Sequence, residues 1–269
     1  MSSSLDSDSV ATMSSKDTLH LYHDTKYAAE AFTALDRVVE YKTYPSNRFE
    51  ACVKFFLDRF HGGDILELGG GSGLVARSLI DHGLAFNTYT LTELSDNRLK
   101  GLARNFKDSR VRVTKMDAEA IPDTELSRYD AVIMLALIAQ LVDPLGTMQR
   151  VRQVLKPGGF VFVETPNIAK FTRRAKLLTG RFPAIASRNE GLTSYEGTAV
   201  ALHDEGHLHY FTFRSLSRML LERCGFARVE KIPYFVGPNG RKFLGHQLGH
   251  MLAQLRPELF SEIVIAAYA

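Results

Sequence analysis

The stretch DILELGGGSGLVARSLIDHG, residues 64–83, decides how the rest of the chain is interpreted. An apolar run with one acid, Glu67, leads into a cluster of glycines, and an amphipathic segment follows. Glycine-rich turns between a strand and a helix bring the backbone close to phosphates, dinucleotides and sulfonium nucleosides alike. The turn therefore predicts a nucleotide-like ligand, and the surrounding sequence has to select the class.

Short β-rich runs alternate with helical segments on either side of this turn. The β-rich runs are 64–69, 86–94, 111–116, 129–135 and 160–166. Such alternation predicts an α/β fold with a parallel sheet and helices on both faces. Two further runs, 227–236 and 262–269, close the chain with a long loop and little room for a crossover helix between them, so they predict an antiparallel pair at the sheet edge.

Composition limits the classes of protein. The 269 residues, 45% of them hydrophobic, are enough for one soluble domain, and a net charge of +3 is too small to indicate a nucleic-acid partner. The longest apolar run, 131–139, is far shorter than the roughly 18 residues of a membrane span. The two cysteines, Cys52 and Cys224, fall in amphipathic stretches and predict buried thiols. With no export-signal pattern at the start, we expect a cytoplasmic protein.

The chain divides into three parts. The Ser/Asp-rich residues 1–18 predict a disordered tail, and residues 19–61 a helical lid. Residues 62–269 form the main domain. Within it, 168–212 are more than a short crossover needs, so they predict an insertion that acts as a lid or contacts the substrate.

Two templates compete for the glycine turn. From Gly71 the sequence fits the dinucleotide fingerprint G-x-G-x-x-A, with Glu93 about 20 residues on, which leaves an NAD(P)-dependent oxidoreductase as an alternative. From Ile65, ILELGGGSG resembles the class I S-adenosylmethionine-dependent methyltransferases. TLTELS, KMDAEAIP, YDAVIML and VRQVLKPGGFVFVETPN follow in the order of that family, and HLHYFTFRSLSRMLLERCGF resembles its quinone, sugar and MetW-like members.

The resemblance implies a Rossmann-like, seven-stranded, mostly parallel sheet with an antiparallel last strand. It also implies S-adenosylmethionine as cofactor and a small-molecule acceptor, most simply methylated at oxygen. By the same likeness, Glu67 orients the amino acid end of the cofactor, Glu93 holds the ribose hydroxyls and Asp117 the adenine amino group. The remaining residues of the expected cofactor site are Gly69, Gly71, Gly73, Leu94, Ala118 and, from the lid, Arg48.

Methylation of a hydroxyl calls for a base, and three histidines, His203, His207 and His209, lie in ALHDEGHLHYFT. Asp204 and Glu205 beside them are placed to orient an imidazole and raise its pKa. We therefore predict His207 or His203 as the base, with His209 as a third candidate, and no metal site. Each of the three can instead be a structural histidine bonded to backbone.

The sequence also departs from the family. Where many small-molecule members read L-E-H-L-x-D-P, this chain reads IAQLVDP, so Ala139 and Gln140 replace the acid and the histidine. The loss leaves a non-catalytic cofactor-binding protein as a second alternative. The N-P-P-Y motif of amino-N-methyltransferases acting on nucleic acid or protein is missing after the fourth strand, which argues against base methylation.

Cations crowd the predicted insertion before its first acid. If they face a cleft, they favour an anionic or carrier-bound acceptor, and if they face water they indicate a solvated helix. They are Lys170, Arg173, Arg174, Lys176, Arg181 and Arg188.

Overall fold

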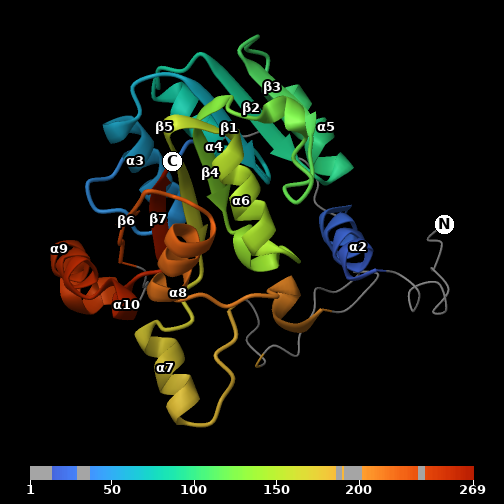
Figure 1. The fold of residues 1–269 in the computed structure, drawn as a ribbon. Coiled ribbons are helices and arrows are strands. Elements are labelled where there is room, and N and C mark those ends of the chain that lie inside the picture. The colour runs from blue at the N-terminus through green and yellow to red at the C-terminus, as the bar shows by residue number, and fades with distance from the viewer. Residues whose placement is uncertain (1–13, 29–36, 186–189, 191–201, 236–239) are drawn as a thin grey trace.

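The structure, a computed structural model, describes residues 14–28, 37–185, 190, 202–235 and 240–269. A seven-stranded sheet runs through its centre in the order β3-β2-β1-β4-β5-β7-β6 (Figure 1). Only β7 runs antiparallel to its neighbours, so the predicted fold class is confirmed. The strands are β1 Asp64–Leu68, β2 Thr88–Glu93, β3 Val111–Lys115, β4 Tyr129–Leu135, β5 Leu155–Thr165, β6 Arg228–Lys231 and β7 Ile263–Tyr268.

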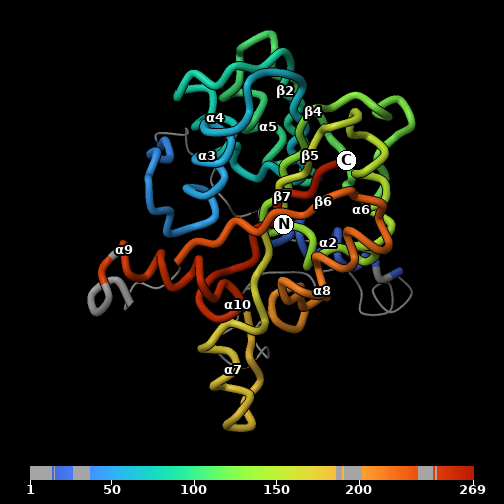
Figure 2. Tube along the Cα trace, turned by 60° about the vertical axis from the view of Figure 1, so that its left-hand side comes forward, coloured from blue at the N-terminus to red at the C-terminus, as the bar shows by residue number. Residues whose placement is uncertain are grey.

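The apolar strands form because side chains on both faces of the sheet are covered by helices. Alternate residues point to opposite faces, so Leu66 and Val132 join one core cluster while Ile65 and Ile133 join the other. Helices α3 (Arg48–Arg59), α4 (Leu74–Asp81) and α5 (Asp96–Asn105) cover one face, and α6 (Pro144–Val154) and α8 (Phe213–Arg218) cover the other (Figure 2). Each buried aliphatic side chain contributes about 1.5–3 kcal/mol, which explains why these strands are continuous apolar runs.

Local signals in the sequence set several helix starts. The Asn47 side chain accepts a hydrogen bond from Glu50 N–H at the start of α3, and Asp143 does the same for Gly146 N–H before α6. Thr212 and Ser215 form a reciprocal capping box at the start of α8. Short helical turns complete the chain: η1 Asp123–Glu125, η2 Ile138–Gln140, η3 His203–Gly206 and η4 Met219–Arg223.

The connection between the last two strands is helical, which corrects the expected long loop. Helices α9 (Gly240–Leu255) and α10 (Pro257–Phe260) lie between β6 and β7, although the two strands do pair antiparallel as predicted. Glycines interrupt the apolar repeat of this segment, and Gly245 adopts φ +68° at a kink inside α9. The interruption hides the helix from a pattern analysis.

Two segments lie over the carboxyl ends of the strands. The first is α2 (Ser15–Ala28), which packs against α5 and begins inside the predicted tail; residues 1–13 lie outside the described residues. The second is the predicted insertion, whose ends meet where Ile168 N–H donates to Phe211 O at 3.0 Å. Its helix α7 (Phe171–Leu178) projects from the body in both views (Figures 1 and 2).

Two sequence expectations concern the chain as a whole. Cys52 and Cys224 are buried free thiols, as predicted. Within the described ranges, no helix has both the length and the apolar character that a membrane crossing requires.

Candidate active site

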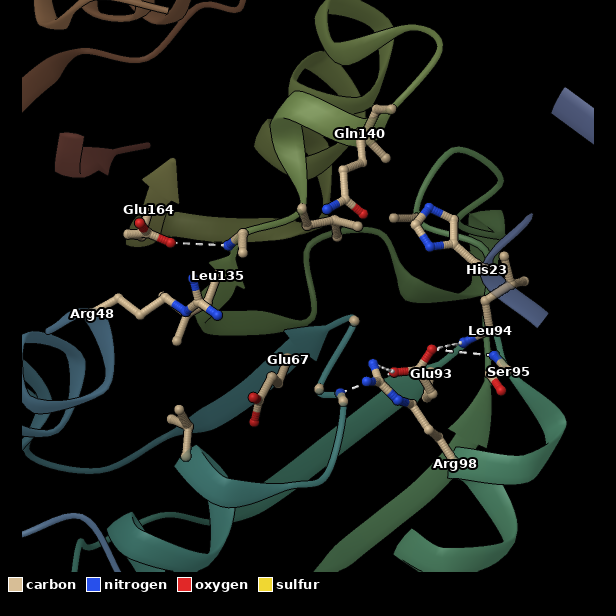
Figure 3. Close-up of a pocket in the computed structure, with 18 of the residues that line it drawn as sticks. His23, Arg48, Glu67, Glu93, Leu94, Ser95, Arg98, Leu135, Gln140 and Glu164 are labelled. Atoms are coloured by element: carbon tan, nitrogen blue, oxygen red, sulfur yellow. Dashed lines mark hydrogen bonds and ion pairs between the residues drawn. The ribbon is translucent and has the colours of Figure 1, made fainter. Parts of the chain in front are cut away.

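A cavity of about 840 Å³ opens at the carboxyl ends of the parallel strands (Figure 3). Small-molecule sites commonly measure about 300–1,000 Å³. Residues at or after the ends of β1 to β5 line it, and it is therefore centred where β2 and β4 leave β1 in opposite directions. Doubly wound sheets bind their ligands at this point because the following loops diverge there.

The glycine turn forms one wall. Gly69 and Gly71 adopt φ +67° and +59°, a region that residues with a Cβ avoid. Gly71 has open space around an added Cβ, with only an Arg98 nitrogen at 3.6 Å, so its bare backbone borders the cavity. Gly73 differs, because an added Cβ would meet the Phe106 ring at 2.6 Å and it is not among the lining residues. Packing of α4 on α5, rather than ligand contact, requires glycine at Gly73.

Glu93, at the end of β2, ties the second strand to the glycine turn. Its Oε2 accepts a hydrogen bond from Gly71 N–H at 2.9 Å, and its Oε1 accepts from Leu94 N–H at 2.7 Å. The carboxylate is buried; Oε1 also accepts from Ser95 N–H at 3.2 Å, and Oε2 lies 3.9 Å from an Arg98 nitrogen. Oε2 therefore keeps a lone pair for a ligand hydroxyl. Glu93 and Leu94 both line the cavity, as the predicted ribose contacts would have to do (Figure 3).

Glu67, at the end of β1, is a buried acid with one hydrogen-bond donor. The Tyr89 hydroxyl donates to its Oε2 at 2.5 Å. Burial raises the pKa of Glu67 to about 7, opposed by this hydrogen bond and assisted by the nearby charge of Glu93. A cation brought into the cavity would therefore lower the pKa of Glu67 and favour its ionised form.

The loop after β3 carries Asp117 and Ala118, which both line the cavity. Asp117 Oδ1 accepts from Glu119 N–H at 2.9 Å, which closes the turn, while its Oδ2 pairs with Lys16 Nζ of α2 at 2.8 Å. Helix α2 therefore reaches the loop predicted to hold the adenine. It also supplies His23, whose pKa is lowered to about 4, chiefly by burial and then by the charge of Lys26.

The three predicted histidines separate in space. His207 lines the cavity, and its Nδ1 lies 2.8 Å from Asp204 O. Because a carbonyl only accepts, the neutral ring that makes this contact carries its proton on Nδ1 and has its lone pair on Nε2. His203 is exposed and packs edge-on against Phe182, and His209 Nε2 lies 3.3 Å from Val142 O. Neither of these two lines the cavity.

The wall opposite the glycine turn contains residues that sequence analysis missed. Glu164 ends β5, Tyr234 follows β6, and Glu262 precedes β7. Arg48 of α3, which was predicted for the cofactor site, lines the same cavity, and its Nε is buried with no hydrogen-bond partner among the described residues. The sequence held one signal for this wall, because Glu164 is an acid that directly follows the apolar run FVFV. Tyr234 and Glu262 lie about thirty residues apart in the sequence, so no local pattern joins them.

Most of the predicted cation cluster does not face the cavity. Arg173 lines it, but Arg173 and Lys170 both pair with Glu262, at 3.0 and 3.1 Å. Arg181 pairs with Glu190 on the surface, and Arg188 lies outside the described residues. Gln140, noted in the sequence, does line the cavity, and the described chain holds no cluster of three His, Cys, Asp or Glu side chains suited to a metal ion.

Comparisons with known proteins agree with this geometry. The methyltransferase domain family matches residues 41–231. The ubiquinone biosynthesis O-methyltransferase of Nitrosospira multiformis is 30% identical over 111 residues, which are 40% of this chain and 45% of that protein. This chain thus spans less than half of that relative's length.

Two solved structures share the fold. Phosphoethanolamine N-methyltransferase 2 of Haemonchus contortus, solved with S-adenosyl-L-methionine, superimposes with a TM-score of 0.52 at 17% identity, over 82% of this chain and 52% of that one. An S-adenosylmethionine-dependent methyltransferase of Mesorhizobium loti does so with a TM-score of 0.50 at 16% identity, over 77% and 90%.

Proposed function

This chain belongs to the class I S-adenosylmethionine-dependent methyltransferases, and we propose that it methylates a hydroxyl oxygen of a small-molecule acceptor. The methyl donor that the family implies is S-adenosyl-L-methionine. The relative from Nitrosospira multiformis is an O-methyltransferase by name, which favours oxygen over nitrogen or carbon here.

One observation carries the proposal: a single cavity joins the glycine turn and its acids to a second charged wall. Gly71, Glu93 and Asp117 occupy the end over β1 to β3, while Glu164 and Arg48 occupy the end toward β5 (Figure 3). The first end suits a nucleoside, because carboxylates accept hydrogen bonds from ribose hydroxyls and an adenine amino group. The second end is left for the methionine carboxylate, through Arg48, and for the acceptor.

The chemistry asks mainly for placement. A sulfonium is already an activated leaving group, so in-line attack on its methyl carbon needs an acceptor held in near-attack geometry, a contribution of about 7–11 kcal/mol. A hydroxyl acceptor also needs a proton acceptor. Two side chains that line the cavity can serve, His207 through Nε2 and Glu164 through its carboxylate.

We also propose an anionic or carrier-bound acceptor, supported by Arg173, the one residue of the predicted cation cluster that lines the cavity among the described residues. Lys170 and Arg173 already pair with Glu262, so added salt should weaken acceptor binding modestly rather than steeply. A steep loss of acceptor affinity between low and high salt would restore the stronger form of the prediction.

Isothermal titration of the purified protein with S-adenosylmethionine and S-adenosylhomocysteine tests the cofactor assignment. Incubation of cell extract with methyl-labelled cofactor, followed by mass spectrometry, then identifies a product heavier by one labelled methyl group. Loss of that product after blocking of free hydroxyls supports O-methylation. Binding of NADH in a fluorescence titration, without binding of S-adenosylmethionine, would support the oxidoreductase alternative and refute the proposal. Cofactor binding with no product from any acceptor would favour the non-catalytic alternative.

A further inference from the structure

Glu164 is a buried carboxylate on the cavity wall. The resemblance to the methyltransferase family assigned no role to it. It is 2% exposed and is the second-last residue of β5, two positions before Pro166. Its Oε2 accepts a hydrogen bond from Ala136 N–H at 3.1 Å, and no other described residue donates a hydrogen bond to its side chain. Buried carboxylates normally collect several donors, so Oε1 is available to a ligand in the cavity.

Glu164 lies across the cavity from the residues assigned to the nucleoside. β4 and β5 are neighbours, with Leu135 opposite Glu164, whereas Glu93 ends β2 on the other side of β1. Figure 3 shows Glu164 and Glu93 at opposite sides of the cavity with Glu67 between them. If Glu93 holds the ribose of the methyl donor, the sulfonium and methionine part of that donor extends toward Glu164.

The groups that face Glu164 keep it able to bind and release a proton near neutrality. Burial raises the pKa of Glu164 to about 7, Glu262 raises it further, and Arg48, the Ala136 N–H and Arg173 oppose the rise. Tyr234 and Cys52 also face it, and their own pKa values are raised mainly by burial. A proton acceptor works best when its pKa is close to the working pH.

We propose that Glu164 is the base that removes the hydroxyl proton of the acceptor during methyl transfer. The inference rests on the proposed function and names Glu164 as the proton acceptor of that reaction. The acceptor O–H proton passes to the Glu164 carboxylate while the oxygen forms a bond to the methyl carbon. The carbon–sulfur bond breaks, and its electron pair stays on sulfur, which gives a neutral thioether and a neutral carboxylic acid.

The position of His207 distinguishes it from Glu164. His207 directly follows η3, and it lies near His23 of α2, on the side of the cavity where α2 covers the Asp117 loop. Glu164 is instead on the wall left free for the acceptor, beside Arg48, whose positive charge favours the ionised form of the carboxylate.

The test compares Glu164→Gln with wild type on the hydroxyl acceptor found by the labelling experiment. Glutamine keeps the volume and the acceptor for Ala136 N–H but cannot take a proton. We expect the turnover number to fall by about 10²–10⁴-fold, with the dissociation constant for S-adenosylmethionine within about twofold of wild type. The acidic limb of the wild-type rate profile, with its midpoint near pH 7, should disappear. Glu125→Gln, which removes a buried carboxylate outside the cavity, is the matched control.

Retention of the wild-type rate and acidic limb in Glu164→Gln would overturn the inference, as would loss of that limb in His207→Asn alone. A second measurement needs no acceptor. Infrared titration of the S-adenosylhomocysteine complex, wild type minus Glu164→Gln, should show a protonated carboxyl band that disappears with a midpoint near pH 7. A midpoint below about 5, the range of an ordinary glutamate, would overturn it. Failure of wild type to methylate any hydroxyl would instead refute the proposed function.

Discussion

Replacement of Glu67 by glutamine should stabilise the ligand-free protein at alkaline pH. Burial raises the pKa of Glu67 from 4.5 to about 7. The folded protein therefore binds this proton more tightly than the unfolded chain, and stability falls as pH rises from about 4.5 to 7. At pH 8 the buried charge costs about 3 kcal/mol, because one pKa unit equals about 1.4 kcal/mol. Glutamine retains the acceptor for the Tyr89 hydroxyl and removes the charge.

Denaturant unfolding from pH 3 to 9 measures the effect and covers the titration of both Glu67 and the control residue Glu50. The free energy of unfolding of Glu67→Gln minus that of wild type should grow by about 1–3 kcal/mol between pH 5 and 8 and then level off. Glu50→Gln is a control of opposite sign, since hydrogen bonds from Lys42 and Ser46 outweigh burial and lower the pKa of Glu50. Glu50 stabilises the fold above its unfolded pKa of about 4.5, and this contribution is lost as pH falls through its lower folded pKa. The Glu50→Gln deficit should therefore shrink below about pH 4.5.

The same substitution should separate stability from cofactor binding. If Glu67 orients the cationic amino acid end of the cofactor, Glu67→Gln binds S-adenosylmethionine more weakly above pH 7 while it unfolds less readily. A difference in unfolding free energy that stays constant within about 0.5 kcal/mol across the pH range would refute the reasoning about burial. Unchanged cofactor affinity in a more stable variant would refute only the binding role.

Three other predictions test the turn, the adenine loop and the acceptor wall. Gly83→Ala should lower the free energy of unfolding by about 1–2 kcal/mol, from its positive φ alone. Gly73→Ala should lower it by about 1–3 kcal/mol more, because its Cβ collides with Leu102 and Phe106 at the end of α5. Urea unfolding measures both, and equal losses would contradict the packing argument. Asp117→Asn should weaken S-adenosylmethionine binding about tenfold in calorimetry with a stability change below about 1 kcal/mol, and unchanged affinity would remove Asp117 from the site. Arg48→Met should move the acidic limb of the rate profile to higher pH, since the cation lowers the pKa of Glu164; a fixed limb would mean that Arg48 does not act on it.

The strand pattern was predictable because burial on both faces leaves a local mark. Runs such as 131–135 are apolar throughout, and helices cover both sides of them in the folded protein. The helix α9 was not predictable in the same way, because glycines break its repeat and its packing against α10 is formed only in three dimensions.

The sequence alone predicted most of the residues that line the proposed cofactor end of the cavity. Gly69, Gly71 and Glu93 lie within thirty residues of one another, so one turn and the next strand carry the whole signal. Only the tertiary structure decided the acceptor end. Glu164, Tyr234 and Glu262 come from three segments spread over about one hundred residues, and the sheet order brings them to the cavity that Arg48, predicted from the sequence, also lines. The physical reason is that a pKa or an unpaired guanidinium depends on burial and on neighbours distant in sequence, neither of which a local pattern encodes.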